Sequence, residues 1–206
     1  MVRGPYGYRS FIMTWIPAFE VGLVNGWLFM IVYPLQWLAV LVLPKRIVER
    51  TRHHPEIVKT RKDRIVAFLL QGLWIGATLL SIFLPLRIGT PWFWVGLASF
   101  LAGLAALVLA SVAVARTPNN VPFTTGIYRF SRHPMYLSML LVYLGVSIAA
   151  VSWLFFLVTV ATFFLQRCQM LREEEHCIAR FGRRYRDYIA VTARWFGLPS
   201  RSRDVA

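Results

Sequence analysis

A short basic motif and an acidic triplet contain most of the residues that could do chemistry in this chain. The motif reads Arg132-His133-Pro134-Met135-Tyr136, and the triplet is Glu173-Glu174-Glu175, in a sequence with only nine acidic residues. An imidazole and a carboxylate can each take a proton, and a guanidinium pairs with a carboxylate through two hydrogen bonds. We therefore expect these residues to form a polar pocket.

Glu174 is predicted to lie on the apolar face of an amphipathic helix. Alternating steps of three and four place it on one stripe with Leu171, Ile178, Phe181, Tyr185 and Tyr188. A carboxylate on such a face is costly unless it is paired or hydrogen-bonded. Its expected partner is Arg132, His133, Arg194 or the amine of a ligand.

The composition is typical of a membrane protein. Of 206 residues, 57% are hydrophobic and only 16% are charged, whereas about a quarter are charged in soluble domains. The net charge of +14 comes from basic residues in the gaps between apolar blocks and in the C-terminal tail, where they can meet anionic headgroups. No motif for nucleic acid and no metal-ligand spacing accompanies them, so we expect neither a nucleic-acid partner nor a metal site.

The apolar blocks predict an all-α polytopic membrane protein with about five transmembrane helices, because a crossing takes roughly 20 residues. Single helices are expected at 17–43, 65–86 and 92–115. Residues 135–170 are too long for one crossing and predict a helical hairpin with its turn at 147–152, followed by a cytoplasmic amphipathic helix. The first block also exceeds the apolar region of a signal peptide, so we expect it to be retained. Glu20, near its start, has no assigned role.

The distribution of Lys and Arg predicts the orientation, because cytoplasmic segments carry the excess of positive charge. Segments 44–64, 116–133 and 167–206 hold eight, three and nine of these residues, and the others are Arg3, Arg9 and Arg87. We expect the N-terminus outside and the C-terminus inside a bacterial or archaeal cytoplasmic membrane. Both ends of the hairpin then return to the cytoplasmic face, which brings Arg132 to Tyr136 near Glu173 and Glu174.

The order of motifs in residues 116–199 resembles the integral membrane methyltransferases typified by isoprenylcysteine carboxyl methyltransferase and the phospholipid methyltransferases. The pattern comprises Gly126-Ile127-Tyr128, the Arg132 to Tyr136 motif, the hairpin, Glu173-Glu174, Phe181-Gly182 with Tyr185 and Tyr188, and Arg194. The segment before Gly126 is shorter than in the prenylcysteine enzymes. The acceptor therefore stays open among hydrophobic or lipid-like carboxylates, amines and thiols.

The resemblance implies methyl transfer from S-adenosylmethionine at the cytoplasmic membrane face. The cofactor-binding residues that it implies are Gly126, Tyr128, Arg132, His133, Pro134, Tyr136, Glu173 and Glu174, and the catalytic residues are His133, Glu174 and Arg194. Residues 1–115 would supply three transmembrane helices, and residues 116–206 the cofactor-binding and catalytic region. The expected partners are membrane lipids and a hydrophobic small-molecule or lipid acceptor.

Two other functions remain open. Membrane sterol reductases resemble the same C-terminal region and bind NADPH, but they are usually much longer. A non-catalytic membrane adaptor or transporter would retain only the scaffold, and the chain lacks the duplicated halves common in transporters. The small size and the intact Glu173-Glu174 pair favour the methyltransferase.

Overall fold

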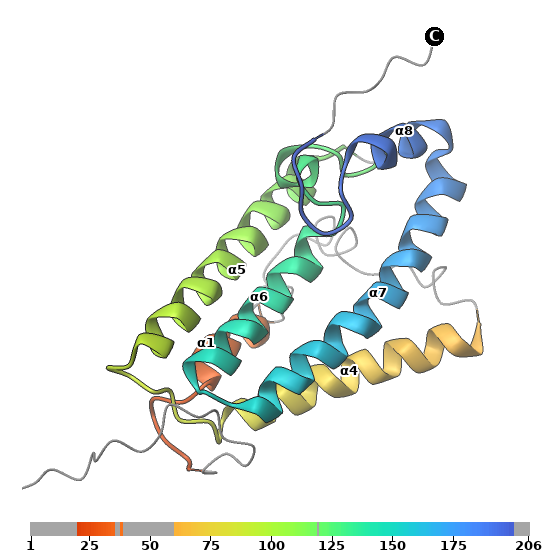
Figure 1. The fold of residues 1–206 in the computed structure, drawn as a ribbon. Helices are drawn as coiled ribbons and strands as arrows, with labels where there is room; N and C mark the ends of the chain where they lie inside the picture. Colours follow the sequence, from red (N-terminus) through yellow and green to blue (C-terminus); the bar gives the residue numbers. More distant parts are fainter. Residues whose placement is uncertain (1–19, 36–37, 39–59, 119, 200–206) are drawn as a thin grey trace, which may run out of the picture.

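A computed structural model describes all of the chain except residues 1–19, 36–37, 39–59, 119 and 200–206. The described part is mostly helical and contains no strand. Its elements are α1 (Trp27–Met30), α4 (Arg61–Ser81), α5 (Pro91–Arg116), the 3-10 helix η2 (Gly126–Arg129), α6 (Pro134–Ala149), α7 (Trp153–Phe181) and α8 (Arg183–Val191). Figure 1 shows the long helices side by side, with α8 at one end of the bundle. The helical content of the described residues confirms the predicted all-α membrane fold.

Local sequence signals explain where the long helices begin. The Thr60 and Asp63 side chains form a capping box at the start of α4, and the Thr90 hydroxyl accepts a hydrogen bond from Phe93 N at the start of α5. The Ser152 side chain caps α7 in the same way. These contacts satisfy backbone N–H groups that the first turn of a helix leaves unpaired.

Within the described residues three helices, α4, α5 and α7, are long and apolar enough to cross a membrane, whereas α6 is a shorter apolar helix of 16 residues. α5 agrees closely with the span predicted at 92–115. α4 begins and ends a few residues before the span predicted at 65–86. The block at 17–43 lies largely outside the described residues, so the number of crossings stays a prediction.

The hairpin predicted at 135–170 is present as α6 and α7. Its turn is tighter than expected, because α6 continues to Ala149 and α7 begins at Trp153. Val151 has a φ of 54° in this turn, which is a left-handed conformation. α7 has 29 residues, and about 20 from Trp153 suffice to cross the hydrocarbon layer. Its last turns, which carry Glu173 and Glu174, therefore extend beyond the membrane-spanning segment.

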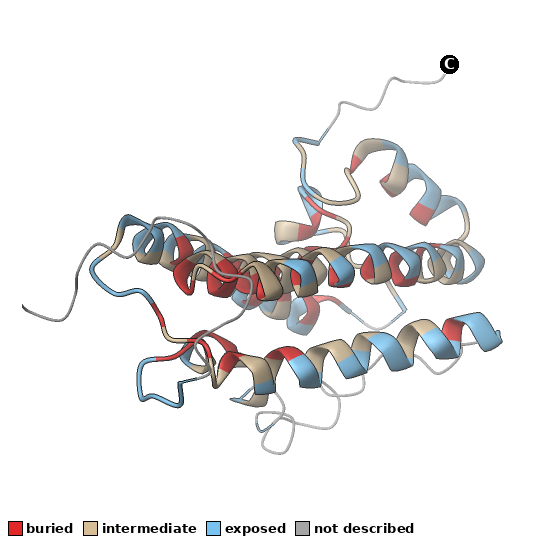
Figure 2. Cartoon of the chain, turned by 60° about the horizontal axis from the view of Figure 1, so that its bottom comes forward, coloured by how far each residue is buried: buried red, intermediate tan, exposed pale blue. Residues whose placement is uncertain are grey.

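α5 and α6 pack unusually closely because glycines lie where they meet. A Cβ at Gly96 would lie 2.6 Å from the Gly145 carbonyl oxygen, and a Cβ at Gly103 would lie 2.8 Å from the Ser138 carbonyl oxygen. Such small residues let membrane helices approach each other. The buried residues in Figure 2 accordingly gather where the helices face one another. This packing fixes the start of α6, where the polar motif stands.

The segment that was predicted to form one amphipathic helix after the hairpin forms parts of two helices in the structure. α7 runs through the acidic triplet to Phe181, Gly182 adopts a φ of 59°, and α8 follows in a new direction. Glu174, Tyr185 and Tyr188 are buried as the stripe predicted, but Leu171 is 41% exposed. The break arises because only glycine takes this backbone conformation without strain.

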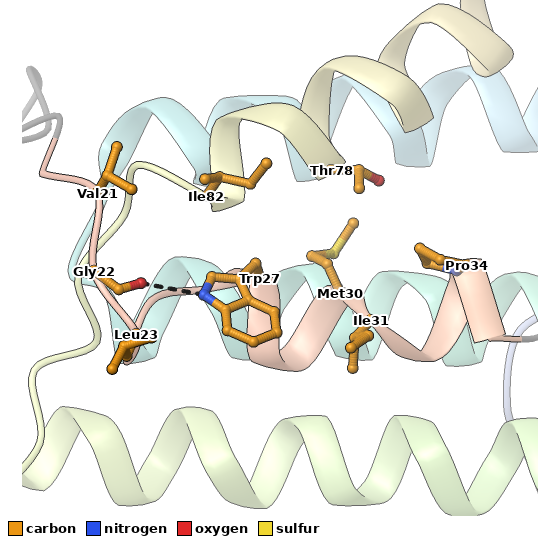
Figure 3. Close-up of a pocket in the computed structure, with 9 residues that line it drawn as sticks. All are labelled: Val21, Gly22, Leu23, Trp27, Met30, Ile31, Pro34, Thr78 and Ile82. Atoms are coloured by element: carbon orange, nitrogen blue, oxygen red, sulfur yellow. Dashed lines mark hydrogen bonds between the residues drawn. The ribbon is translucent and has the colours of Figure 1, made fainter.

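An apolar pocket of about 520 Å³ lies between residues 21–34 and the end of α4 (Figure 3). The Arg172 guanidinium binds the Asp63 carboxylate at 2.9 Å, so the beginning of α4 lies beside the end of α7. The pocket, beside Thr78 and Ile82, is consequently at the opposite end of the bundle from Glu173 and Glu174.

Candidate active site

Three segments that are distant in sequence meet at the α8 end of the bundle. They are the loop that leads into α6, the last turns of α7, and the chain that follows α8. α6 and α7 are the antiparallel arms of a hairpin, so His133 at the start of one faces Glu174 near the end of the other. Pro134 occupies the first position of α6, where its missing N–H leaves no hydrogen bond unmade.

Glu174 is the centre of a buried ion cluster. The Arg194 guanidinium donates two hydrogen bonds to it, from Nε to Oε1 at 3.0 Å and from Nη2 to Oε2 at 2.8 Å. His133 Nε2 lies 3.2 Å and Arg132 Nε 3.3 Å from Oε1. Glu174 is only 6% exposed. Three of the partners expected from the sequence therefore surround the carboxylate together.

Glu173 forms the second half of the cluster. Its Oε1 accepts a hydrogen bond from the Tyr136 hydroxyl, and its Oε2 lies 3.5 Å from His133 Nδ1. The His133 ring thus has a carboxylate at each nitrogen, an arrangement that suits an imidazolium, which donates from both. A charged imidazole between two adjacent acidic residues follows from this geometry.

The surroundings shift the pKa of both His133 and Glu174. Burial lowers the pKa of His133, but hydrogen bonds and charges from Glu173 and Glu174 outweigh burial and raise it above its ordinary value. Burial would raise the pKa of Glu174, yet the contacts with His133, Arg194 and Arg132 lower it to about 2. Both groups are therefore held in their charged forms.

Arg132 connects the cluster to the end of α8. Its backbone N donates to the Ala193 carbonyl at 2.9 Å, and its Nη1 donates to the Ile189 carbonyl at 3.4 Å. Although Arg132 Nε is close to Glu174, it makes no hydrogen bond and is buried. One guanidinium N–H is thus left for another acceptor.

The chain after α8 returns across the start of α6. Gly197 N donates to the Phe130 carbonyl at 2.9 Å, and the Ser131 hydroxyl donates to the Arg194 carbonyl at 3.4 Å. The Trp195 ring stacks on Phe163 of α7 with centroids 4.8 Å apart. Ser131 and the backbone of Ala193 and Gly197 were not predicted, since backbone contacts leave no sequence signal.

Gly126 and Tyr128 lie between the ion cluster and α5 and support the loop that leads into α6. Gly126 begins η2 with a φ of 62°, and Tyr128 is buried against Ala110, Ala113 and Val114 of α5. The Tyr188 hydroxyl donates to the Tyr128 carbonyl at 2.6 Å, which fastens α8 to η2. Burial, together with the nearby Glu173 carboxylate, raises the pKa of Tyr128.

The structure therefore brings six predicted site residues into direct contact: Arg132, His133, Tyr136, Glu173, Glu174 and Arg194. Gly126, Tyr128 and Pro134 shape the backbone and the wall beside them. Among the described residues no group of three or more His, Cys, Asp and Glu is arranged to hold a metal ion.

Comparison with known proteins gives one family. The family described as phospholipid methyltransferase matches residues 88–184, a little less than half of the chain. No curated protein and no solved structure matches. The match begins earlier than the resemblance drawn over residues 116–199, so it includes α5, and it ends before Arg194.

The family indicates methyltransferase activity on lipid-like substrates, and with the three apolar helices it indicates an integral membrane protein. Over residues 88–184 the chain is thus similar to the phospholipid methyltransferase family.

Proposed function

We propose that the protein transfers a methyl group from S-adenosylmethionine to a hydrophobic or lipid-like acceptor at the cytoplasmic membrane face. The observation that carries the proposal is the buried cluster in which two carboxylates meet two guanidiniums and an imidazole. A cofactor that carries both an ammonium and a carboxylate needs partners of both signs. The cluster offers them in one place.

The residues present fit such a cofactor. Arg132 Nε is a buried donor without a hydrogen bond, which suits the cofactor's carboxylate. The side chain of Glu173 is 16% exposed and lies between Tyr136 and His133, so it suits the ammonium or the ribose hydroxyls. The Tyr136 ring, whose centroid is 5.7 Å from that of His133, would offer an aromatic face to the sulfonium, worth about 0.5 to 2 kcal/mol.

S-adenosylmethionine supplies an electrophilic methyl group, and the protein has to position the acceptor and exclude water. An anionic acceptor needs no base. For a neutral acceptor, His133 can accept a proton only in its neutral form, which the two glutamates disfavour by raising its pKa, and Glu174 is a weak base because its carboxyl has a pKa of about 2. We assign Arg194 the role of holding the loop or orienting an acidic acceptor.

The placement of the cluster supports a membrane-borne acceptor. Glu173 and Glu174 follow directly on the membrane-spanning part of α7, and exposed apolar side chains such as Phe164 continue along that helix. An acceptor with a hydrocarbon chain can therefore approach from the bilayer without leaving it. The identity of its reacting group stays open among carboxylate, amine and thiol.

Equilibrium binding of S-adenosylmethionine and S-adenosylhomocysteine to the purified protein in lipid nanodiscs tests the proposal. We expect His133→Ala and Glu173→Gln to weaken binding by at least tenfold, since each removes a charged partner. Glu175→Gln is the matched control, because Glu175 is paired with Arg172 outside the cluster. Absence of binding to folded protein, or equal losses in the control, would reject the proposal.

A further inference from the structure

The adjacent residues Glu173 and Glu174 differ in whether their carboxylates are open to a ligand. We infer that Glu174 is a positioning residue, which fastens the segment Thr192–Gly197 over the site, and that it does not itself contact the cofactor. We call this segment the C-terminal strap. The inference rests on the proposed function and assigns a distinct role to one residue of that site.

The contacts of Glu174 leave little room for a further partner. A carboxylate offers about four lone-pair directions. Arg194 Nε, His133 Nε2 and Arg132 Nε surround Oε1, and Arg194 Nη2 occupies Oε2. With its side chain 8% exposed and three cationic side chains around it, Glu174 presents little surface to a ligand.

The Glu174 carboxylate supplies the charged anchor of the strap. The strap has no regular secondary structure, so ordering it costs backbone conformational entropy that its contacts must offset. Its backbone makes hydrogen bonds with Phe130, Ser131 and Arg132, and Trp195 stacks on Phe163. Among the described residues, the bidentate pair between Arg194 and Glu174 is the only ion pair between the strap and α7.

The position of the strap determines the position of the motif. Arg132 N and the Phe130 carbonyl both bind the strap, and the Ser131 hydroxyl, which donates to the Arg194 carbonyl, accepts a hydrogen bond from His133 N. Release of the strap would therefore loosen the backbone on both sides of Ser131. Glu174 thus acts on the cofactor through Arg132 and His133.

The test measures strap docking and ligand binding separately. Hydrogen exchange of the Gly197 amide reports docking without any ligand, because Gly197 N donates to Phe130. The affinity for S-adenosylhomocysteine reports whether the cofactor site is intact. The variants are Glu174→Gln, Arg194→Gln, their double variant and Glu173→Gln, with Glu175→Gln and Arg183→Gln as exposed controls.

We expect Glu174→Gln and Arg194→Gln each to accelerate Gly197 exchange and to weaken binding by about tenfold. The double variant should bind no more weakly than either single variant, since both substitutions remove the same ion pair between Arg194 and Glu174. Glu173→Gln should weaken binding while exchange stays slow. Arg194→Gln carries the same test if Glu174→Gln does not fold.

Slow exchange in Glu174→Gln with lost affinity would overturn the inference, because Glu174 would then be a direct ligand. Additive losses in the double variant would overturn it as well. A wild-type protein that binds neither cofactor form rejects the proposed function instead, whereas the exchange measurement still decides whether Glu174 holds the strap.

Discussion

His133 gives the cluster a predictable dependence on pH. Glu173 and Glu174 raise its pKa above the ordinary value of about 6.5. A group whose pKa is raised by folding stabilises the folded state below its unfolded pKa, and this contribution is lost as the pH rises through the folded pKa. We therefore expect the melting temperature of the wild type to exceed that of His133→Gln at about pH 6, and the difference to shrink toward about pH 9.

Thermal unfolding of both proteins in the same detergent, over a pH series, measures this difference. Titrations that the two proteins share cancel in the comparison. A difference that stays constant or grows with pH would show that His133 is not charged between the two glutamates.

Tyr136 offers a second prediction at the level of single atoms. Its hydroxyl donates to Glu173, and its ring lies 5.7 Å from that of His133. Tyr136→Phe keeps the ring and removes the hydrogen bond, which is worth about 1 kcal/mol or more. We expect the affinity for S-adenosylhomocysteine to fall by about three- to tenfold.

Tyr143→Phe is the matched control for Tyr136→Phe. It also removes one buried hydroxyl, but that hydroxyl has no partner in the described part of the chain. Isothermal titration of the two variants should separate them. Equal affinities would show that the Tyr136 hydroxyl does not orient Glu173.

At the scale of elements, the glycines of the membrane helices predict opposite effects of one substitution. A Cβ at Gly96 would lie 2.6 Å from backbone atoms of α6, whereas a Cβ at Gly72 in α4 would meet nothing within 4 Å. Gly96→Ala should destabilise by about 1 to 3 kcal/mol because α5 and α6 must separate. Gly72→Ala should stabilise by up to about 1 kcal/mol through helix propensity.

Unfolding of both glycine variants in mixed detergent micelles gives the two free energies. Because the same methyl group is added in each, differences in hydrophobicity cancel. A neutral or stabilising Gly96→Ala would contradict the close packing of α5 on α6.

The sequence predicts these elements better than it predicts their contacts. Apolar block length located α5 and the α6–α7 hairpin, because a membrane crossing dictates length. The periodic stripe correctly predicted that Glu174 is buried, but it did not predict the helix break at Gly182. A 3.6-residue period can continue across a glycine, and the φ of that glycine depends on the tertiary fold. Arg194 of the strap was predicted, but Ser131 and the backbone contacts of the strap were missed, because residue types do not encode hydrogen bonds to the backbone.

At the scale of the whole molecule, the unequal distribution of Lys and Arg predicts which face holds the site. The ion pair of Asp63 with Arg172 brings the start of α4, with its basic residues Arg61, Lys62 and Arg64, to the same end as the end of α7, and Gly89 lies between α4 and α5. If positive charge sets the orientation, a reporter fused after Ala206 is cytoplasmic and one inserted at Gly89 is outside. Paired phosphatase and fluorescent-protein fusions at both positions measure this. Opposite signals at both positions would place the cluster on the outer face, where intracellular S-adenosylmethionine does not reach it, and the proposed reaction would then fail on topology alone.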